Sequence, residues 1–397
     1  MDIAIAGSGT AGMAVAALLA RDSHKVTLFE RFDEAQPVGS GLMLQPTGMA
    51  VLGALNRRGE ALARGARIER LHGMADGRIV LDVRYASLRR PDGFGLAIHR
   101  ADLFDLLHGA ALAAGARFRT GRSVTTAAAG SLHFADGSRE GPFDLVIDAT
   151  GSRSPLAGEA ATPLAYGALW TTVEGIDGLI PSDTLSQRYH RACQMAGLLP
   201  LGRGANGVNR TALFWSLRAD RYDATMAAGT AAWRAAWTEL WPETAAFAEA
   251  VPAVETMTFA RYAHRTRRAP VADRLVHIGD SWHSTSPQLG QGANQALLDA
   301  YALAVALRGN GPLQDRLDRA IASRRRHVGL YQAMSHWLTP VYQSDGRLVP
   351  LLRDWLVGPL SSIWPVPQVQ ARMVSGLVGR PLERLGLGGP CTTGTDV

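Results

Sequence analysis

Residues 279–294, GDSWHSTSPQLGQGAN, combine the residue types expected of a loop that contacts a ligand. A Gly-Asp pair comes first, a proline follows, and a Gly-Gln-Gly-x-Asn run leads into an Ala- and Leu-rich stretch that predicts a helix over about 293–307. Glycine lets the backbone approach a ligand closely, and a helix start offers N–H groups and the positive end of a dipole. The segment therefore indicates a loop that lies against something flat and anionic.

A second glycine-rich segment, GSGTAG at residues 7–12, has the spacing of a dinucleotide-binding turn. It follows a short apolar run and precedes an Ala- and Leu-rich stretch, which is the strand–turn–helix context that this motif requires. The first glycine permits the tight turn, the second lets the backbone approach a pyrophosphate, and the third allows close packing of helix on strand. The predicted nucleotide contacts here are Gly7, Gly9, Thr10, Ala11 and Gly12.

An acidic residue follows this turn at the distance that a dinucleotide fold requires. Glu30 ends a second predicted strand, 18 residues after Gly12, where a carboxylate accepts hydrogen bonds from both ribose hydroxyls. A carboxylate there would repel a 2′-phosphate, so the bound nucleotide is expected to be FAD or NAD rather than NADP. Arg31, the next residue, is a further candidate contact.

The loop at 279–294 also decides between FAD and NAD, because it resembles the class A flavoprotein monooxygenases, the para-hydroxybenzoate hydroxylase-like family. In that family a GD-x-x-H-x-x-x-P-x-x-G-Q-G-x-N segment follows a late strand. The residues that match it are Gly279, Asp280, His283, Pro287, Gly290, Gln291, Gly292 and Asn294. The resemblance implies FAD as the cofactor.

The same resemblance implies a place for each part of this loop. Asp280 would hydrogen-bond the ribityl or ribose side of FAD, and Pro287 would lie beside the reactive face of the ring. The run from Gly290 to Asn294, which includes Gly292 and Ala293, would place backbone N–H groups near the flavin O2 edge. A positive helix end at that edge stabilises the negative charge of reduced flavin.

Two further segments are similar to family motifs. His99 to Leu103 resembles an H-R-x-D-L helix start, whose arginine, here Arg100, would reach the FAD phosphates or adjoining backbone. Gly39 to Leu42 resembles the loop beside the flavin, which makes Gly41 and Leu42 candidate contacts. A surface or capping arginine and a plain surface turn are the competing interpretations.

One motif departs from the family pattern. The family has A-D-G-x-x-S after its middle strand, whereas this chain has Thr150 where that aspartate would stand. Either Asp148 substitutes from a shifted position, or reduction by NAD(P)H is handled differently. The choice between NADH and NADPH stays open.

The predicted fold is α/β: a Rossmann-like FAD-binding domain with an inserted antiparallel-sheet substrate domain and a helical C-terminal tail. Apolar strand patterns near both ends of the first 280 residues flank a middle region of short strands and turns. The predicted segments are 1–154 for the first part of the FAD-binding domain, 155–265 for the substrate-binding domain, 266–330 for the second part of the FAD-binding domain and 331–397 for the helical C-terminal segment.

Composition restricts the partners. The net charge is +6 and Lys25 is the only lysine, but the arginines are scattered, so we expect no nucleic-acid binding and infer attraction for anionic small molecules.

Cys193 and Cys391 stand far apart, which predicts neither a disulfide nor a metal site and fits a cytoplasmic protein. No apolar run is long enough for stable membrane insertion, and the chain is expected to be a monomer or homodimer.

The resemblance implies that NADH or NADPH reduces FAD, that O₂ adds at flavin C4a, and that the hydroperoxide hydroxylates or epoxidises a small aromatic or polyketide-like substrate. Pro287 and His283 are the catalytic candidates, although His283 also fits a hydrogen-bonded structural residue. The alternatives are a flavin reductase or dehydrogenase, a halogenase, for which Lys25 is poorly placed, and a non-catalytic FAD-binding protein.

Residues of the middle region are candidates for lining the substrate pocket. Strand residues alternate in direction, so we expect about half of the candidates to face the pocket. The candidates are Gln187, Arg188, Tyr189, His190, Met195 and Trp215. A tryptophan stripe, Trp233, Trp237 and Trp241, is expected to be core packing rather than a substrate box. For three C-terminal tryptophans, Trp337, Trp355 and Trp364, the alternatives are capping of the domain, a dimer contact and contact with a membrane surface. We expect capping, because the basic residues nearby are too sparse for an interfacial helix.

Overall fold

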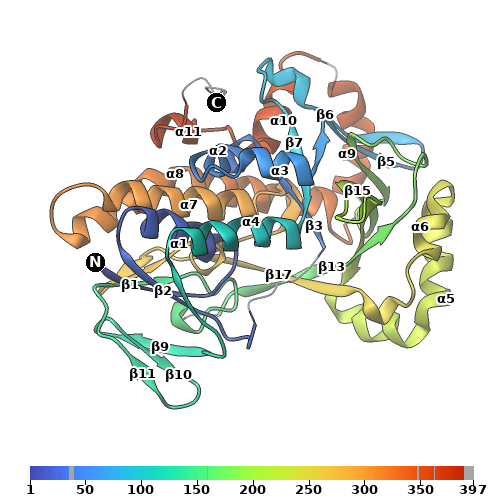
Figure 1. Cartoon of the computed structure of the whole chain (residues 1–397). Helices are drawn as coiled ribbons and strands as arrows, with labels where there is room; N and C mark the ends of the chain where they lie inside the picture. Colours follow the sequence, from blue (N-terminus) through green and yellow to red (C-terminus); the bar gives the residue numbers. More distant parts are fainter. Residues whose placement is uncertain (35–39, 159, 347, 362, 389–397) are drawn as a thin grey trace.

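The computed structural model describes residues 1–34, 40–158, 160–346, 348–361 and 363–388 (Figure 1). Gly39 and Cys391 lie outside the described residues. The fold has a parallel sheet with helices, an antiparallel sheet with its own helices, and C-terminal helices, which confirms the predicted α/β class.

The parallel sheet is built from segments far apart in the chain. β1 pairs in parallel with β2 on one side and with β12 on the other, and β12 pairs in parallel with β19. Across the sheet the order is β18 (Val271–Ala272), β19 (Leu275–His277), β12 (Leu145–Asp148), β1 (Asp2–Ala6), β2 (Lys25–Phe29) and β8 (Arg117–Arg119). The late strand before the 279–294 loop therefore lies two strands from the one that leads into GSGTAG.

Alternate residues of β1 bury against different layers. Ile3 and Ile5 pack with the helices, whereas Ala4 and Ala6 pack with a small three-stranded sheet. The helices on the first face are α1 (Thr10–Arg21), α4 (Arg100–Ala113), α7 (Gly292–Leu307) and α8 (Leu313–Tyr342), with α2 (Pro46–Ala54) and α3 (Arg58–Arg64) beside them. The small sheet, β9 (Val124–Ala128), β10 (Ser131–Phe134) and β11 (Arg139–Glu140), projects at the lower left of Figure 1. Burial on both faces explains why residues 3–6 of β1 are all apolar.

The antiparallel sheet has eight strands and carries the middle region. Its order is β20 (His283–Ser284), β17 (Thr258–Thr266), β13 (Thr162–Glu174), β16 (Asn209–Arg218), β15 (Gln194–Arg203), β14 (Thr184–His190), β5 (Arg70–Ala75) and β6 (Arg78–Arg84). β5 joins β14 in parallel and brings in residues 70–84, which precede the middle region in the chain. At the opposite edge β20 lies within the 279–294 loop, so the two sheets meet at that loop.

The tryptophan stripe of the middle region lies in a core. Trp233, Trp237 and Trp241 are all buried and pack against Trp215 of β16, so the prediction of core packing is confirmed. These residues belong to or adjoin α5 (Tyr222–Leu240), which together with α6 (Ala245–Glu249) covers the outer face of the sheet at the right of Figure 1.

A third sheet lies between the two large ones, and three helices follow α8. The sheet consists of β3 (Gly41–Leu44), β7 (Gly95–His99) and β4 (Ala66–Ile68). The later helices are α9 (Leu348–Leu360), α10 (Val366–Val374) and α11 (Pro381–Arg384). Of the described residues, no helix is both long and apolar enough to span a bilayer.

The three C-terminal tryptophans do not cap the domain, so that prediction is wrong. Trp337, Trp355 and Trp364 are 77%, 60% and 75% exposed. The helices α8 and α9, which carry Trp337 and Trp355, bury other residues instead, and Trp364 lies in a turn after α9.

Candidate functional site

The GSGTAG turn has the geometry of a phosphate-binding turn. Gly7 has φ +98°, and a Cβ on Gly12 would lie 1.9 Å from the Gly7 carbonyl oxygen, so neither position accepts a side chain without rearrangement. A Cβ on Gly9 would meet nothing within 4 Å, which leaves its backbone open to a ligand. Gly9 is the N-cap of α1 and cannot cap it with a side chain, so the first N–H groups, from Thr10 onward, are available to a pyrophosphate. The residues present fit a dinucleotide.

Glu30 lies at the end of β2 beside this turn and is 8% exposed. Its Oε2 atom accepts hydrogen bonds from the Ser8 backbone N–H at 2.9 Å and from the Ser8 hydroxyl at 2.6 Å, and its Oε1 accepts from the Phe32 N–H at 3.2 Å. These bonds fix the carboxylate next to the turn and leave lone pairs for a ribose. Arg31 stacks its guanidinium on the ring of Phe32, at 4.7 Å from the centroid, and is exposed.

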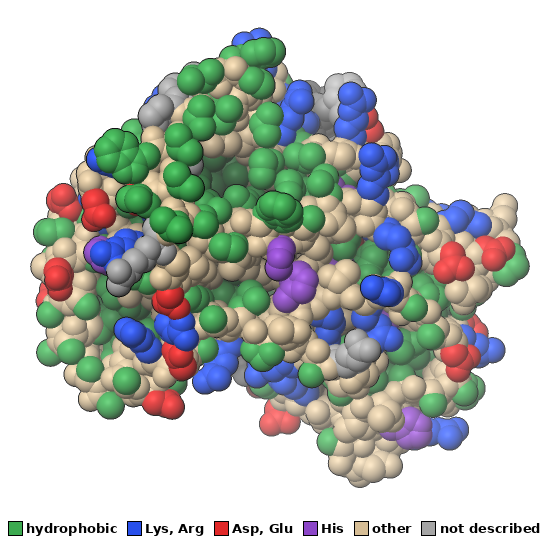
Figure 2. Space-filling view, turned by 180° about the vertical axis from the view of Figure 1, so that it is seen from behind, with side chains coloured by type: hydrophobic (Ala, Val, Ile, Leu, Met, Phe, Trp, Pro, Cys, Tyr) green, Lys and Arg blue, Asp and Glu red, His purple; other side chains and the backbone are tan. Residues whose placement is uncertain are grey.

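A cavity of about 1340 Å³ lies between the parallel and antiparallel sheets. This exceeds the range of roughly 300–1,000 Å³ typical of pockets for one small ligand, so it offers room for a cofactor ring and a substrate together. Its lining includes most of the loop residues predicted from sequence: Gly41, Leu42, Arg100, Asp280, His283, Pro287, Gly290, Gly292 and Ala293. Figure 2 shows a hollow on the face opposite to that of Figure 1, bordered above by hydrophobic side chains.

The loop after β20 is shaped by proline and glycine. Pro287 begins a short 3₁₀ turn, and Gly290 ends it in the left-handed region at φ +61°. Gly292 then begins α7, whose N-cap residue Gln291 sends its side chain to the Val374 carbonyl oxygen at 2.5 Å rather than to the helix. The first N–H groups of α7 therefore remain available to a ligand in the cavity.

Two charged side chains, those of Asp280 and Arg100, line the cavity and interact electrostatically. Asp280 is open only to the cavity interior and remains surrounded by protein, so burial raises the pKa of its carboxyl group, while the charges of His283 and Arg100 act in the opposite direction. Burial also lowers the pKa of Arg100, and Asp280 opposes that effect. Hydrogen-bond donors and acceptors of a bound cofactor would relieve the desolvation of both groups.

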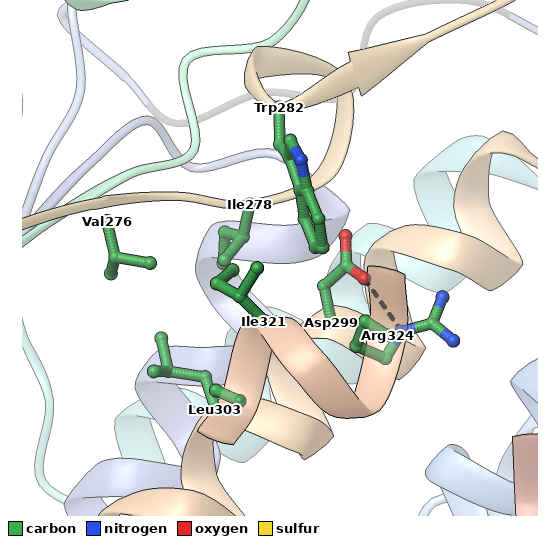
Figure 3. Close-up of a pocket in the computed structure, with 8 residues that line it drawn as sticks. Val276, Ile278, Trp282, Asp299, Leu303, Ile321 and Arg324 are labelled. Carbon is green, nitrogen blue, oxygen red and sulfur yellow. Dashed lines mark hydrogen bonds and ion pairs between the residues drawn. The ribbon is translucent and has the colours of Figure 1, made fainter. Parts of the chain in front are cut away.

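His283 lines the cavity but is held from behind. Its Nε2 lies 2.6 Å from Oδ2 of Asp299 on α7, and that oxygen also accepts the Gly279 N–H at 3.0 Å. The other oxygen of Asp299 accepts from Nε of Arg324 on α8 at 2.9 Å, the ion pair drawn in Figure 3. Burial favours a higher pKa for Asp299, but the charges of His283 and Arg324 lower it overall. This network fixes the start of the 279–294 loop to two helices.

Trp282, the neighbour of His283, points away from the cavity. It is 2% exposed, packs in the helical core and donates from Nε1 to the Arg267 carbonyl oxygen at 3.2 Å. Figure 3 shows it beside a void of about 10 Å³ near Asp299 and Arg324. Such a void holds about one water molecule at most, so it is a packing defect rather than a ligand site.

Asn294 has a structural side chain. Its Oδ1 accepts the Gln45 N–H at 2.7 Å, and its Nδ2 donates to the carbonyl oxygens of Met43 and Gly290 at 3.2 and 3.1 Å. A Cβ on Gly48 would lie 2.3 Å from that Oδ1, so α2 approaches α7 closely only because Gly48 is a glycine. The amide thus ties β3 and α2 to the loop, and any cofactor contact of Asn294 would be through its backbone N–H.

Asp148 does not take the place of the missing family aspartate. It is fully buried, and its oxygens accept from the Thr150 N–H and hydroxyl, the Ser154 hydroxyl and Nδ1 of His277, at 2.5 to 3.0 Å. Burial favours a higher pKa for Asp148. The hydrogen bond and the charge of His277, together with the hydrogen bonds of Ser154 and Thr150, outweigh this effect and lower the pKa overall. The carboxylate holds its own loop and points at no cavity.

The middle-region candidates divide by strand face. Gln187, Tyr189 and Met195 line the cavity, whereas Arg188, His190 and Trp215 do not, in agreement with the alternation of strand residues. Residues 187 and 189 lie on one face of β14 and residues 188 and 190 on the other.

Several residues that line the cavity were not predicted from the sequence. Leu71, Leu81 and Val83 come from β5 and β6, and the parallel pairing with β14 that brings them to the cavity leaves no local signal. Tyr262 on β17 also lines the cavity and receives the Nε1–H of Trp170 at 3.4 Å, and burial raises its pKa to about 12. The strand pattern of TFARYAHRT, which contains this tyrosine, was the sequence signal that could have identified it.

Comparison with known proteins agrees with this site. A family model described as FAD binding domain matches residues 1–331. A 3-amino-4-hydroxybenzoate 2-monooxygenase of Streptomyces cremeus is 29% identical over 76% of this chain and 77% of its own length. A putative 2-heptyl-3-hydroxy-4(1H)-quinolone synthase of Rhodococcus erythropolis is 28% identical over 88% of this chain and 90% of its own.

A solved structure supports the fold. A tetrameric form of 2-methyl-3-hydroxypyridine-5-carboxylic acid oxygenase superposes with a TM-score of 0.77 over 96% of this chain and 97% of its own, at 19% sequence identity. The arrangement of the two large sheets and the C-terminal helices is therefore one that a known oxygenase adopts.

Proposed function

The chain belongs to the FAD binding domain family and is an FAD-dependent monooxygenase, and from that premise we propose that it hydroxylates a neutral heteroaromatic compound with an apolar substituent. NADH or NADPH supplies two electrons, one atom of O₂ enters the substrate and the other leaves as water. Bound FAD supplies the oxygen-activating chemistry.

The residues of the chain would hold the cofactor in two places. The GSGTAG turn and Glu30 would bind the pyrophosphate and ribose, and the loop from Pro287 to Ala293 would lie along the ring, with the N-terminus of α7 at its electron-rich edge. Asp280 and Arg100 would bind polar groups between these places. His283 would position the loop through Asp299 rather than act on the substrate.

The cavity wall that the antiparallel sheet supplies carries the substrate proposal. Seven apolar side chains from five strands line this part: Leu71, Leu81, Val83, Leu185, Met195, Leu199 and Phe214. Gln187 lies among them as a neutral polar group able to accept and donate hydrogen bonds. This part of the wall favours an alkyl or aryl substituent, with Gln187 to orient the ring, whereas Arg261 and Arg265 of β17 line the cavity elsewhere on the same sheet. The alkyl-quinolone name of one relative fits this chemistry better than the carboxylated benzoate name of another.

The test compares the two substrate chemistries directly. FAD-loaded protein is mixed with a 4-quinolone that carries an alkyl chain at C2 and hydrogen at C3, or with an amino-hydroxybenzoate, and NADH or NADPH oxidation, O₂ uptake and product mass are measured. We expect the quinolone to stimulate all three and to gain one oxygen. Stimulation by the benzoate alone would refute the substrate class, and a purified protein that retains no FAD would refute the function.

A further inference from the structure

Helix α9 presents its apolar side to the outside. Positions 348, 351, 352, 355 and 356 follow the i, i+3, i+4, i+7, i+8 spacing of one helix face, and all five side chains are apolar. A surface helix normally buries this stripe. Here the five residues, Leu348, Leu351, Leu352, Trp355 and Leu356, are between 51% and 76% exposed.

A buried arginine fixes this orientation. Arg353, on the opposite side of α9, is 3% exposed and donates to the carbonyl oxygens of Arg191 and Val341 at 2.7 and 3.1 Å. It pairs with Asp354, and its guanidinium lies 5.1 Å from the ring centroid of Tyr189. Rolling the helix to bury its leucines would break the hydrogen bonds that Arg353 donates and leave these part-buried carbonyl groups unpaired, which is costly. The outward apolar face is therefore set by the fold.

The exposed face extends beyond α9. Of the described residues, sixteen large hydrophobic side chains are exposed, and eleven of them fall within 337–369. We call this group the C-terminal apolar surface: Trp337, Leu348, Val349, Leu351, Leu352, Trp355, Leu356, Leu360, Ile363, Trp364 and Val369. In Figure 2 hydrophobic side chains gather at the upper left, where the helices at the upper right of Figure 1 lie when seen from behind. This concentration marks an interaction surface rather than scattered exposure.

The charges around this surface favour an anionic partner. The sequence 337–369 holds two acidic residues, of which Asp345 accepts from Tyr166 and pairs with Arg218, and Asp354 pairs with Arg353. At the border the Arg78 guanidinium lies 3.7 Å from the ring centroid of Trp355. Exposed tryptophan and leucine with arginine at the edge suit the boundary between lipid headgroups and acyl chains.

We propose that the C-terminal apolar surface docks this protein peripherally on an anionic lipid bilayer. A second copy of the chain is a poorer partner, because the bordering arginines, Arg78 and the exposed Arg372, would meet no unpaired carboxylate on the same surface: its two acidic residues, Asp345 and Asp354, are already paired. Docking through α9 needs no helix that spans the bilayer.

The same helices line the catalytic cavity from within. Leu338 and Tyr342 of α8, and Gln370 and Met373 of α10, face the cavity, next in sequence to surface residues such as Trp337 and Val369. A lipid-soluble substrate would thus pass from the bilayer into the cavity between α8 and α10. This route rests on the proposed function, whereas docking itself does not.

Vesicle sedimentation tests the docking. The full-length, FAD-loaded protein is mixed with vesicles of equal parts phosphatidylcholine and phosphatidylglycerol, and binding is followed by sedimentation and by the tryptophan emission maximum. We expect the protein to sediment with a blue-shifted emission. The double variant Leu352→Ser/Trp355→Ser should bind at least about tenfold more weakly, which is the effect of 1.4 kcal/mol.

The matched control is Leu112→Ser on α4, which removes an equally apolar side chain that is 51% exposed on another part of the surface. It should bind vesicles like the unaltered chain, and unchanged FAD content and melting temperature show that each variant is folded. The proposal is overturned if the unaltered chain stays in the supernatant or if Leu112→Ser weakens binding equally. It is also overturned if sedimentation velocity shows a dimer that the double variant dissociates while vesicles bind neither form. These outcomes do not depend on turnover, so they separate failure of docking from failure of the proposed function.

Discussion

The Nε2 atom of His283 lies 2.6 Å from Oδ2 of Asp299, so the histidine of the cofactor-side loop is anchored to the middle of α7. Because Asp299 also binds Arg324 on α8, one carboxylate joins the loop to two helices. We therefore propose that His283 positions the loop rather than relays protons.

Replacing His283 separates these roles. His283→Gln retains a side-chain donor for Asp299, so we expect it to lose less than about tenfold in turnover, whereas loss of a general acid–base group typically costs 10²–10⁴-fold. His283→Phe removes the donor from a buried carboxylate and should lower the free energy of unfolding by about 1–3 kcal/mol. Steady-state kinetics across pH and urea unfolding measure the two effects. A flattened pH profile with a hundredfold loss in His283→Gln would assign the relay role instead.

The environment of His327 on α8 leads us to expect that the free energy of unfolding depends on pH. Its Nδ1 lies 3.0 Å from Nη1 of Arg324 and its Nε2 lies 3.0 Å from the Gly376 carbonyl oxygen, an arrangement that suits the neutral ring. Burial, with the charge of Arg324, lowers its pKa from 6.5 to about 3. The unfolded chain therefore binds a proton that the folded chain does not as the pH falls below 6.5, and stability is lost between pH 6.5 and about 3.

His327 is expected to lower the free energy of unfolding by at most about 1.4 kcal/mol for each pH unit of acidification in that window. Urea unfolding at several pH values below 6.5 should show it in the unaltered chain and show a shallower dependence in His327→Gln. His336→Gln, which alters an exposed histidine of the same helix, is the control and should keep the full slope. Equal slopes in all three proteins would contradict the assignment.

Two helical glycines should respond oppositely to alanine. In Gly12→Ala the new methyl would lie 1.9 Å from the Gly7 carbonyl oxygen, so we expect loss of bound FAD and a destabilisation of about 1–3 kcal/mol. In Gly53→Ala, on α2, the methyl meets nothing within 4 Å, and the variant should be more stable by about 0.5–1 kcal/mol. Flavin absorbance and thermal unfolding report both changes. A Gly12→Ala protein with full flavin content would refute the role of this close approach.

Two matched substitutions to tryptophan on β14 test whether its cavity-facing side binds the substrate. Gln187 points into the cavity and His190 points out of it, although both belong to one short strand. We expect Gln187→Trp to raise KM by tenfold or more, a loss of about 1.4 kcal/mol in binding, because its indole fills the apolar part of the cavity. His190→Trp should leave KM unchanged. Similar effects of both substitutions on substrate-stimulated NAD(P)H oxidation would show that the substrate binds elsewhere.

The parallel sheet and the glycine turn were predictable because their signals are local. GSGTAG carries its own geometry, and burial on both faces makes β1 and β12 apolar except for Asp2 and Asp148. The partners of the site residues were not predictable in this way. Nothing near His283 or Asn294 indicates that Asp299 and Gln45 complete their hydrogen bonds, since both depend on how separate elements pack.

The C-terminal helices show a different limit of sequence reading. The spacing of leucines in 348–356 indicates an amphipathic helix, but periodicity alone does not say which side faces the protein. The direction is decided by Arg353, whose carbonyl partners on Arg191 and Val341 come from other elements. The spacing alone therefore does not predict the exposure of Trp355.

The pairing of β12 with both β1 and β19 has a consequence for synthesis on the ribosome. β1 pairs with residues 145–148, and these pair with residues 275–277, so the parallel sheet cannot be completed until residue 277 of the 397 has emerged. Early-made segments must wait with apolar edges open, a state prone to aggregation. Nascent chains that stall before Leu275 should therefore depend on chaperones, and FAD can be captured only late in translation.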